Sequence, residues 1–535
     1  MATSESSAEK PLTLRAPTTD RQVLFRTRDQ TPWAVQPCSQ QTPLVDSTGE
    51  ARRELLRLAQ RWTQQYSVVP EAPQPTDSPV PEVFLSGHQP ELFHPGVWFK
   101  NFVLHEFAKS NAVASVNVLI DQDLVKTNSL LVPTENWRLP TRQRVPIDYG
   151  GVGIPFEERQ IEHPDVLATV PERVKSVAAP WVSAELLTEI WPDAVELGRE
   201  LRGLGYGFAA ARHLAEQRRG CFNLEVPLSW LCQTSSFAQF VVRILEQLES
   251  FVESYNECLA TYRIWHGIAG QQRPMPDLAV HEGWYELPFW LWTAQQPWRR
   301  RVFVRRVADG WQMSTGRTDI KQATQIHSDV WRLDLDHELA IDQLLGFSEL
   351  QIRLRPRALM TTLYARAVLS QGFLHGIGGA LYDQMTDRLA RLVWNIDLPN
   401  YAIATATFHL ATPPAAWTSE RRVQLHQSLR DLSYSPERVP AFARSHPQWM
   451  AEKQELLAKM PPPRQRHAWQ RQIERHLAGA RHELAAEIQA TKSELQLLDL
   501  QLQKRALMQD REWSFVLFEE SVPNELRTLA TKLRK

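Results

Sequence analysis

The sequence predicts an α/β protein built on a parallel sheet, with an inserted α+β region and a helical C-terminal region. Three observations lead to this fold class. An apolar strand, a loop, a helix and a second apolar strand follow one another between residues 83 and 120. A strand, a glycine-rich junction, a helix and another strand follow between residues 372 and 410. From residue 420 onward the chain is charged, and its apolar residues have helical spacing. Strands that alternate with helices are typical of parallel sheets.

The same patterns divide the 535 residues into three parts, since a chain of this length exceeds one simple core. Residues 1–82 are expected to be an N-terminal arm, and residues 83–418 the α/β core, with the insertion at about 198–350. Residues 419–535 are expected to form a helical, coiled-coil region.

Within the N-terminal arm, residues 1–20 are polar and aperiodic, which predicts disorder. Residues 50–66 have the apolar spacing of a helix. The segment 70–81 contains five prolines and is expected to be an extended linker.

The βαβ unit places the first candidate site. Val83–Leu85 and Val116–Ile120 are expected to be adjacent parallel strands, with the helix Trp98–Ser110 crossing over one face. Ligands of open parallel sheets bind beyond the carboxyl ends of the strands. Polar segments follow both strands at that edge, so a small-molecule site is predicted there.

The loop after the first strand supplies several candidate groups, namely Gly87, His88, Gln89 and His94, with Lys100 in the following helix. A histidine at a strand end can act as an acid or a base, and a lysine can neutralise an anion. The alternatives are a histidine bonded to nearby backbone and a solvated lysine.

Asp121 and Asp123 follow the second strand, and Asn128 lies a few residues later. Two carboxylates at this spacing can share an amine, a ribose or a magnesium ion. The alternative is that an aspartate caps a helix by accepting backbone N–H bonds.

A glycine-rich junction opens the later helix, and free N–H groups at such a junction attract anions. The candidate residues of this segment are His375, Gly376, Gly378, Gly379, Tyr382 and Asp383. The junction matches neither a dinucleotide-binding motif nor a P-loop.

Arginine is concentrated upstream of this junction. Arg355 and Arg357 can pair with phosphate or carboxylate, or form structural ion pairs. The run Arg299–Arg301 is interpreted as the solvated face of a strand.

Composition excludes several classes of protein. The net charge of −1 provides no general attraction to nucleic acid or anionic membrane. The four cysteines form no C-x-x-C pair, so neither a structural zinc site nor an oxidising compartment is indicated. No stretch has the length of a membrane span or the pattern of a secretory signal. We expect a cytoplasmic protein with a small-molecule substrate and no metal site, nucleic acid or membrane partner.

Arg464–Met508 is expected to be one long helix, packed along a seam from Leu484 to Leu502. The seam can be covered by another helix of the chain or by a second copy in a homodimer. Trp513–Phe518 is apolar and strand-like.

Three segments, in this order, resemble the bacillithiol-biosynthesis cysteine-adding enzyme family: Ser86–Gly96 (SGHQPELFHPG), Asp121–Asp123 (DQD) and His375–Tyr382 (HGIGGALY). The resemblance implies a Rossmann-like core related to nucleotidyltransferases, and a reaction that joins cysteine to an amine. In this chain His88 replaces the first glutamine of the family's loop, and the acidic motif lacks its leading glutamate and its histidine. These departures indicate a divergent relative.

The combined expectation is a ligase-type or nucleotidyl-transfer enzyme that joins an amino acid to a small amine. His88, Asp121 and Asp123 would be catalytic, and all the candidate groups would face one cleft. The sequence identifies no cofactor; ATP with Mg²⁺ is the candidate. The alternative is a degenerate binding or scaffold protein of the same fold.

Overall fold

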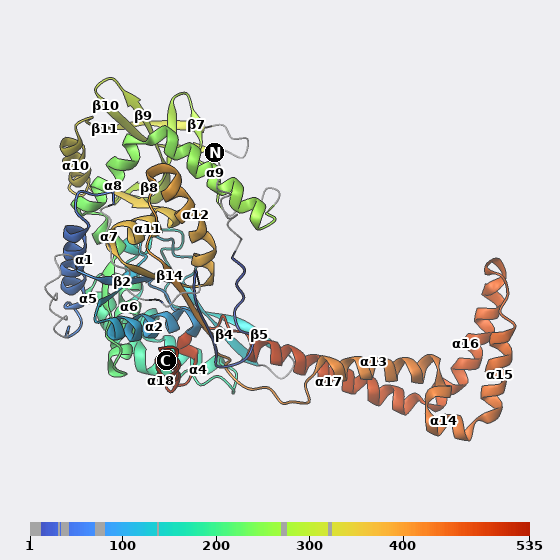
Figure 1. The fold of residues 1–535 in the computed structure, drawn as a ribbon. Coiled ribbons are helices and arrows are strands. Elements are labelled where there is room, and N and C mark those ends of the chain that lie inside the picture. Colours follow the sequence, from blue (N-terminus) through green and yellow to red (C-terminus); the bar gives the residue numbers. More distant parts are fainter. Residues whose placement is uncertain are drawn as a thin grey trace.

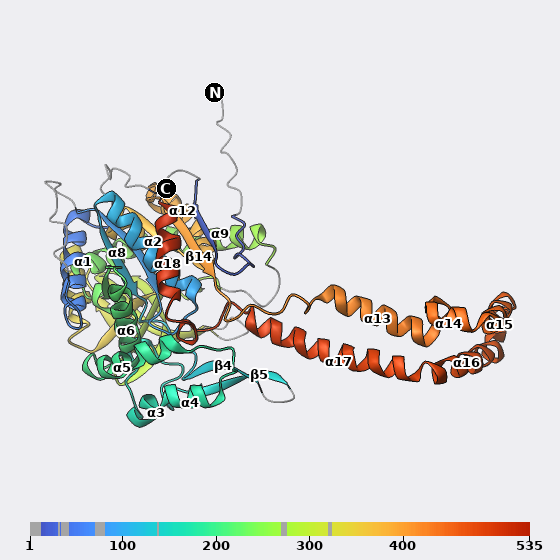
Figure 2. The same ribbon diagram turned by 90° about the horizontal axis from the view of Figure 1, so that it is seen from below.

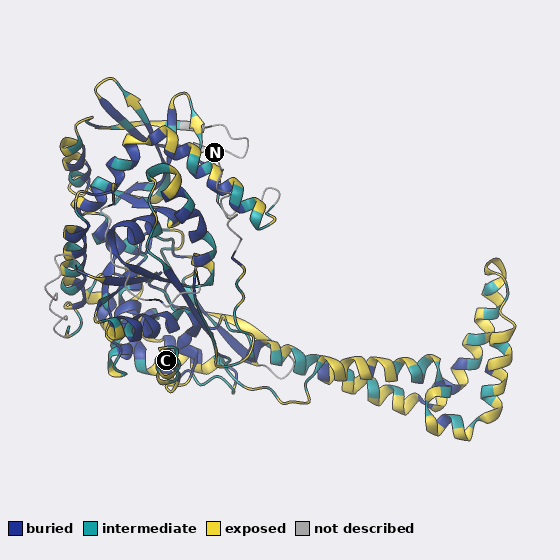
Figure 3. Cartoon of the chain, viewed as in Figure 1, coloured by how far each residue is buried: buried dark blue, intermediate teal, exposed yellow. Residues whose placement is uncertain are grey.

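The computed structural model describes residues 12–29, 33, 42–69, 81–135, 139–268, 275–318 and 324–534. Residues 1–11 of the predicted disordered stretch and 70–80 of the predicted linker lie outside the described residues. A densely buried body carries a helical arm that projects from one end (Figure 1). Most of the arm's residues are exposed or half-buried (Figure 3).

The main sheet has the strand order β1-β14-β13-β2-β3-β6, and all neighbours are parallel except β1 and β14. Its strands are β1 (Gln22–Thr27), β2 (Val83–His88), β3 (Ala114–Leu119), β6 (Leu224–Pro227), β13 (Gly372–His375) and β14 (Tyr401–Thr407). The predicted pairing of the first two core strands is confirmed, with Val83 opposite Ala114 and His88 opposite Leu119.

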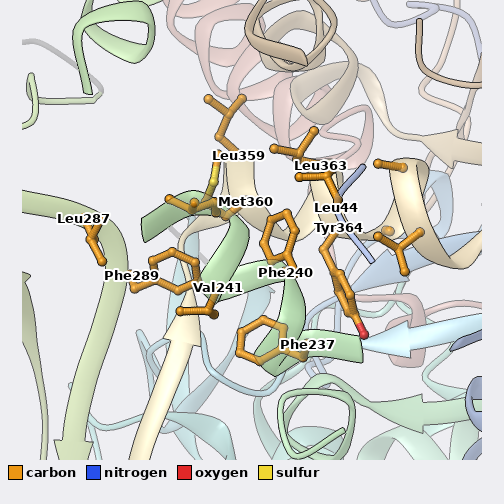
Figure 4. Close-up of a cluster of buried hydrophobic side chains, with 14 of the residues drawn as sticks. Leu44, Phe237, Phe240, Val241, Leu287, Phe289, Leu359, Met360, Leu363 and Tyr364 are labelled. Atoms are coloured by element: carbon orange, nitrogen blue, oxygen red, sulfur yellow. The ribbon is translucent and has the colours of Figure 1, made fainter. Parts of the chain in front are cut away.

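Helices cover both faces of this sheet. Because side chains alternate along a strand, Phe84 packs with Trp98 and Phe102 of α2 (Pro95–Asn111), whereas Leu85 packs into the opposite cluster. The second cluster holds α12 (Ile377–Trp394) and the aromatic group around Phe237, Phe240 and Tyr364 (Figure 4). The two crossover helices therefore lie on opposite faces.

The chain connections cross the sheet in opposite directions on the two sides of the β2–β13 pair. From β2 the chain proceeds to β3 on one side, and from β13 it proceeds to β14 on the other. Such a reversal opens a crevice between the carboxyl ends of the two strands, because their crossover helices leave in opposite directions.

A second, antiparallel sheet has the order β11-β10-β9-β8-β12, with β7 paired to β8. Its strands are β7 (Val280–His281), β8 (Trp284–Thr293), β9 (Gln296–Val307), β10 (Gly310–Thr318), β11 (Thr324–Leu333) and β12 (Ile352–Pro356). β4 (Ser129–Glu135) and β5 (Pro140–Pro146) form a separate pair.

The remaining helices of the body are α1 (Thr48–Thr63), α3 (Pro164–Ala168), α4 (Val170–Val177), α5 (Glu185–Glu200), α6 (Leu204–Arg218), α7 (Leu228–Leu231), α8 (Ser235–Glu246), α9 (Leu248–Trp265), α10 (His337–Gly346), α11 (Ala358–Tyr364) and α18 (Val522–Leu533). A π-helical segment, Ala365–Leu369, continues α11. No helix within the described ranges is both long and apolar enough to span a membrane.

Three segments differ from their expected places in the core. Residues 22–27 and 513–533 are expected outside the α/β core, in the N-terminal and C-terminal parts. In the structure β1 pairs with β14 of the main sheet. Phe515 and Leu526 are buried beside α2. β6 belongs to the main sheet, so the insertion begins after residue 227 and not near 198. Apolar residues far apart in sequence share one core, which a local pattern does not reveal.

The arm consists of α13 (Ser419–Tyr434), α14 (Pro440–Ser445), α15 (Pro447–Ala458), α16 (Arg466–Glu483) and α17 (Ala485–Met508). α13 and α17 run side by side in both views (Figures 1 and 2). The expected single helix Arg464–Met508 is wrong, because Leu484 leaves helical geometry (φ −85°, ψ 14°) and packs with Leu432 and Phe442. The expected strand Trp513–Phe518 contains a 3₁₀ turn, Phe515–Leu517.

Candidate functional site

Four groups meet at the carboxyl ends of β2 and β13. His88 is the last residue of β2 and His375 the last of β13, and Gly376 precedes the first turn of α12. The Nζ atom of Lys100, from α2, donates to the carbonyl oxygen of Gly87 at 2.9 Å. A Cβ atom placed on Gly376 would lie 4.0 Å from Cδ of Lys100. The first loop, the lysine and the glycine junction are thus brought together.

Lys100 is a buried cation without a counterion. It is 5% exposed, and no carboxylate among the described residues forms an ion pair with it. Burial, followed by the repulsion of Arg212, lowers the pKa of Lys100 to about 8. The amine is therefore still mostly charged at neutral pH. Buried charges are normally paired, so an anion would be favoured beside it.

His88 has both ring nitrogens close to acceptors. Nδ1 lies 3.2 Å from the carbonyl oxygen of Gln89, and Nε2 lies 3.2 Å from Oδ1 of Asn101. Burial, then the charges of Arg212 and Lys100, lowers the pKa of His88 well below its usual range. A neutral ring has one N–H and can donate to only one of these two acceptors, so the contact positions the loop through either Gln89 or Asn101.

His94 is a helix cap. Its Nδ1 accepts the backbone N–H of Gly96 at 3.0 Å, at the start of α2. Burial, then Arg511 and Lys100, lowers the pKa of His94 to about 3, which keeps the acceptor nitrogen unprotonated. This nitrogen therefore has a structural role at the start of α2, and the expected substrate contact of His94 stays a prediction.

Asp121 is fully buried and bonded within the protein. Its carboxylate accepts Ser229 N–H at 3.0 Å, the Ser229 hydroxyl, and the Tyr206 hydroxyl at 2.8 Å. Burial, then the charge of Glu157, raises the pKa of Asp121 to about 7. Asp121 lies beyond β3, two strand positions from β13, and it caps the first turn of α7. The alternative considered from the sequence is a local cap before a following helix, whereas this contact joins residues 108 positions apart.

Asp123 joins the first loop to the second sheet. It accepts Nε2 of Gln89 at 2.7 Å and Nη1 of Arg299 at 3.1 Å. The guanidinium of Arg299 lies 4.8 Å from the ring of Trp290, and that of Arg357 lies 4.1 Å from the same ring. Arg299 therefore belongs to the site's edge and not to a solvated strand face; its position in a basic run concealed this.

His375 belongs to a buried ionic network behind the glycine junction. Its Nε2 lies 2.8 Å from Oδ2 of Asp383, and Nη1 of Arg366 lies 2.7 Å from the same oxygen. Although burial alone raises it, Arg366 and His375 hold the pKa of Asp383 well below its usual range. The ionised carboxylate fixes the proton on Nε2 and leaves a lone pair on Nδ1.

The other residues of this segment have different surroundings. A Cβ on Gly379 would lie 2.8 Å from Nδ1 of His375, whereas one on Gly378 would meet nothing within 4 Å. The ring centroids of Tyr382 and Tyr262 of α9 are 5.3 Å apart. Asn128 lines a separate cavity of about 290 Å³ beside the first loop.

Sequence reasoning missed a buried ionic cluster under the site. Arg212 bonds to Glu216 and Glu225, and Glu216 accepts Nδ2 of Asn101 at 2.7 Å. Asn101 in turn contacts His88. One sequence signal could have indicated this cluster: Arg212 and Glu216 are four residues apart on α6, a largely buried helix. Charged side chains on such a helix need partners.

The structure brings His88, Lys100, His375 and Gly376 together at the carboxyl ends of β2 and β13, whereas Asp121 lies beyond β3. No group of three or more His, Cys, Asp and Glu side chains in the described part of the chain is arranged to hold a metal ion. No protein-family model matches the sequence, and comparison with curated proteins finds no significant match.

Proposed function

We propose that the chain is a ligase-type or nucleotidyl-transfer enzyme that joins an amino acid to a small amine. Lys100 and the first turn of α12 hold the phosphate or carboxylate of the substrate. The observation that carries this is a buried lysine amine that has no counterion among the described residues. It lies beside the N-terminal turn of α12, where a Cβ on Gly378 would meet nothing within 4 Å.

Two features support an anion at this place. The helix dipole and the free N–H groups at the start of α12 attract negative charge, and Gly378 leaves the approach open.

We also propose that the main sheet is Rossmann-like, because the chain connections of its parallel strands change direction where the site lies. Ligands of such sheets bind at that reversal.

The chemistry follows from this placement. In acyl or nucleotidyl transfer a protein mainly positions the reactants and stabilises the charge that develops on phosphate or carboxylate. Lys100 supplies the positive charge, and His375, held by Asp383, fixes the glycine junction beside it. ATP with Mg²⁺ is the proposed co-reactant; phosphate oxygens and water would provide most ligands of such an ion.

The alternative is a catalytically degenerate binding or scaffold protein of this fold. Two expected catalytic groups favour this alternative, because both are buried among neighbouring protein groups: His88 lies beside Gln89 and Asn101, and Asp121 accepts hydrogen bonds from Ser229 and Tyr206. Formation of an amide product from ATP, cysteine or another amino acid, and candidate amines separates the two possibilities.

Lys100→Met tests the anion site. We expect ATP affinity to fall roughly 10- to 100-fold, because a charged hydrogen-bond donor is lost. The folded state should be no less stable, because an uncompensated buried charge is removed. Lys109→Met, at the exposed end of the same helix, is the matched control and should bind ATP like the unchanged chain. Equal ATP affinities of the Lys100 variant and the unchanged chain in calorimetry would refute the proposal.

We further propose that α13 and α17 form a short antiparallel coiled coil and that the arm carries a homodimer contact. Leu425 and Leu498 are buried in the arm, whereas Val423 and Leu497 remain 67% and 55% exposed. The exposed apolar side chains are available to a second copy.

A further inference from the structure

We propose that the cavity beside the first loop binds an α-amino acid with an apolar side chain. The cavity has a volume of about 290 Å³ and lies between β4, α6 and the segment that follows the arm. Known ligand pockets start at roughly 300 Å³, so this space suits a molecule of amino-acid size. It is distinct from the crevice at Lys100, which does not line it.

The inner wall of the cavity is apolar. Leu130, Phe156, Phe208 and Trp513 line it and are each buried. Apolar surface of this kind favours a ligand with a hydrocarbon or aromatic side chain, since its transfer from water is favourable. A purely polar metabolite would leave its own groups unsatisfied there.

The remaining lining carries charges of both signs. Glu91, Lys126 and Arg144 all line the cavity, and no salt bridge among the described residues involves them. Burial raises the pKa of Glu91, and the nearby charge of Lys126 only partly offsets this effect. Arg144 donates only to the Thr127 hydroxyl, at 3.2 Å. A carboxylate matches Lys126 and Arg144, and an ammonium group matches Glu91. One small ligand that satisfies both signs is a zwitterion.

A buried hydroxyl adds a second, independent indication. Ser514 lines the cavity and is 7% exposed, and its Oγ has no hydrogen-bond partner. Buried polar groups are nearly always bonded, so we expect this side chain to turn its hydroxyl toward a bound carboxylate or amine. Polar groups beside an apolar wall are the pattern expected for an amino acid.

The loop between the cavity and the crevice links this site to the proposed reaction. Glu91 lies two residues after Gln89, which contacts Asp123, and the Pro90 carbonyl oxygen would lie 3.0 Å from a Cβ on Gly205. The role of the bound amino acid as the acyl donor rests on the proposed function. Its binding rests on the cavity alone.

Calorimetric titration of the full chain with free leucine tests the binding. We expect saturable binding, and affinities roughly 10- to 100-fold lower for leucinamide and 4-methylpentanoate, which lack the carboxylate and the amine respectively. Glu91→Gln should weaken leucine but leave 4-methylpentanoate unchanged. Failure of leucine, phenylalanine, methionine and cysteine all to bind would overturn the proposal.

Leu131→Trp locates the binding, because Leu131 is half-buried and lines the cavity. We expect it to abolish leucine binding, while Leu350→Trp, at a 65% exposed position outside the cavity, leaves it intact. Unaltered affinity in Leu131→Trp, or equal loss in both variants, would overturn the assignment. Lys100→Met should keep leucine affinity, so a failed nucleotide site and a failed amino-acid site give different results.

Discussion

Asp121 shows how burial sets the chemistry of a single residue. Its carboxyl group lies among the hydroxyls of Ser229 and Tyr206, and its pKa is raised to about 7 from an ordinary value of 3.8. Between these two pH values the folded state binds a proton that the unfolded state has released. This residue therefore makes stability decrease as pH rises from about 4 to about 7.

Asp121→Asn should remove this contribution, because an amide does not titrate and still offers an oxygen to Ser229 N–H. We expect the free energy of unfolding to depend less on pH, by at most about 1.4 kcal/mol per pH unit, and the variant to gain relative stability at pH 8. Urea unfolding at pH 5 and pH 8 measures the difference. Identical pH dependence in both proteins would show that Asp121 is ionised when folded.

At the scale of elements, the junction of β13 and α12 depends on two neighbouring glycines for different reasons. Gly379 faces Nδ1 of His375, whose ring is held by Asp383, whereas a Cβ on Gly378 meets nothing within 4 Å. A side chain at Gly379 must therefore displace the ring, while one at Gly378 only replaces a poor helix former.

Gly379→Ala should destabilise the protein by about 1–3 kcal/mol, because it disturbs a buried hydrogen bond between His375 and Asp383. Gly378→Ala, one residue earlier and exposed, should be neutral or stabilising by up to about 1 kcal/mol. Thermal unfolding compares the two. A larger loss in Gly378→Ala would contradict this account of the junction.

At the scale of the whole molecule, the arm leaves the body and returns to it at nearly the same place, so the two ends of the arm are adjacent. Leu410 donates its N–H to the carbonyl oxygen of Met508 at 3.0 Å, and Arg505 donates to the Trp417 carbonyl. After the arm the chain returns to the body, where Trp513 and Phe515 are buried. The arm and the segment after it therefore have different roles in stability.

Replacing residues 414–506 by a short flexible linker should leave a folded body, because the ends of the arm are already adjacent. Ending the chain at residue 511 should prevent stable folding, because several buried side chains are removed, at a cost of about 2–5 kcal/mol each. Circular dichroism and light scattering report both outcomes. A dimeric unchanged chain and a monomeric armless chain would support the homodimer contact; an unfolded armless body would contradict this account of the arm.

Local pattern was enough to predict the βαβ unit from Val83 to Ile120, its parallel pairing and the polar carboxyl edge. Apolar periodicity and turn residues act over a few positions, and the crossover rule then leaves one arrangement. The same reasoning placed Lys100 near the glycine junction. It could not place the break at Leu484, because that residue leaves the helix to pack with Leu432 and Phe442.

Only the tertiary structure decided which polar groups are free and which are already bonded. Asp121 meets Tyr206 and Ser229, 85 and 108 residues away, and so becomes a cap; Asp123 meets Arg299 across 176 residues. Such partners depend on how distant elements pack, and a local sequence pattern does not show which distant residues come into contact. Lys100, in contrast, is buried without a carboxylate partner in the described part of the chain, and this makes it the centre of the proposed site.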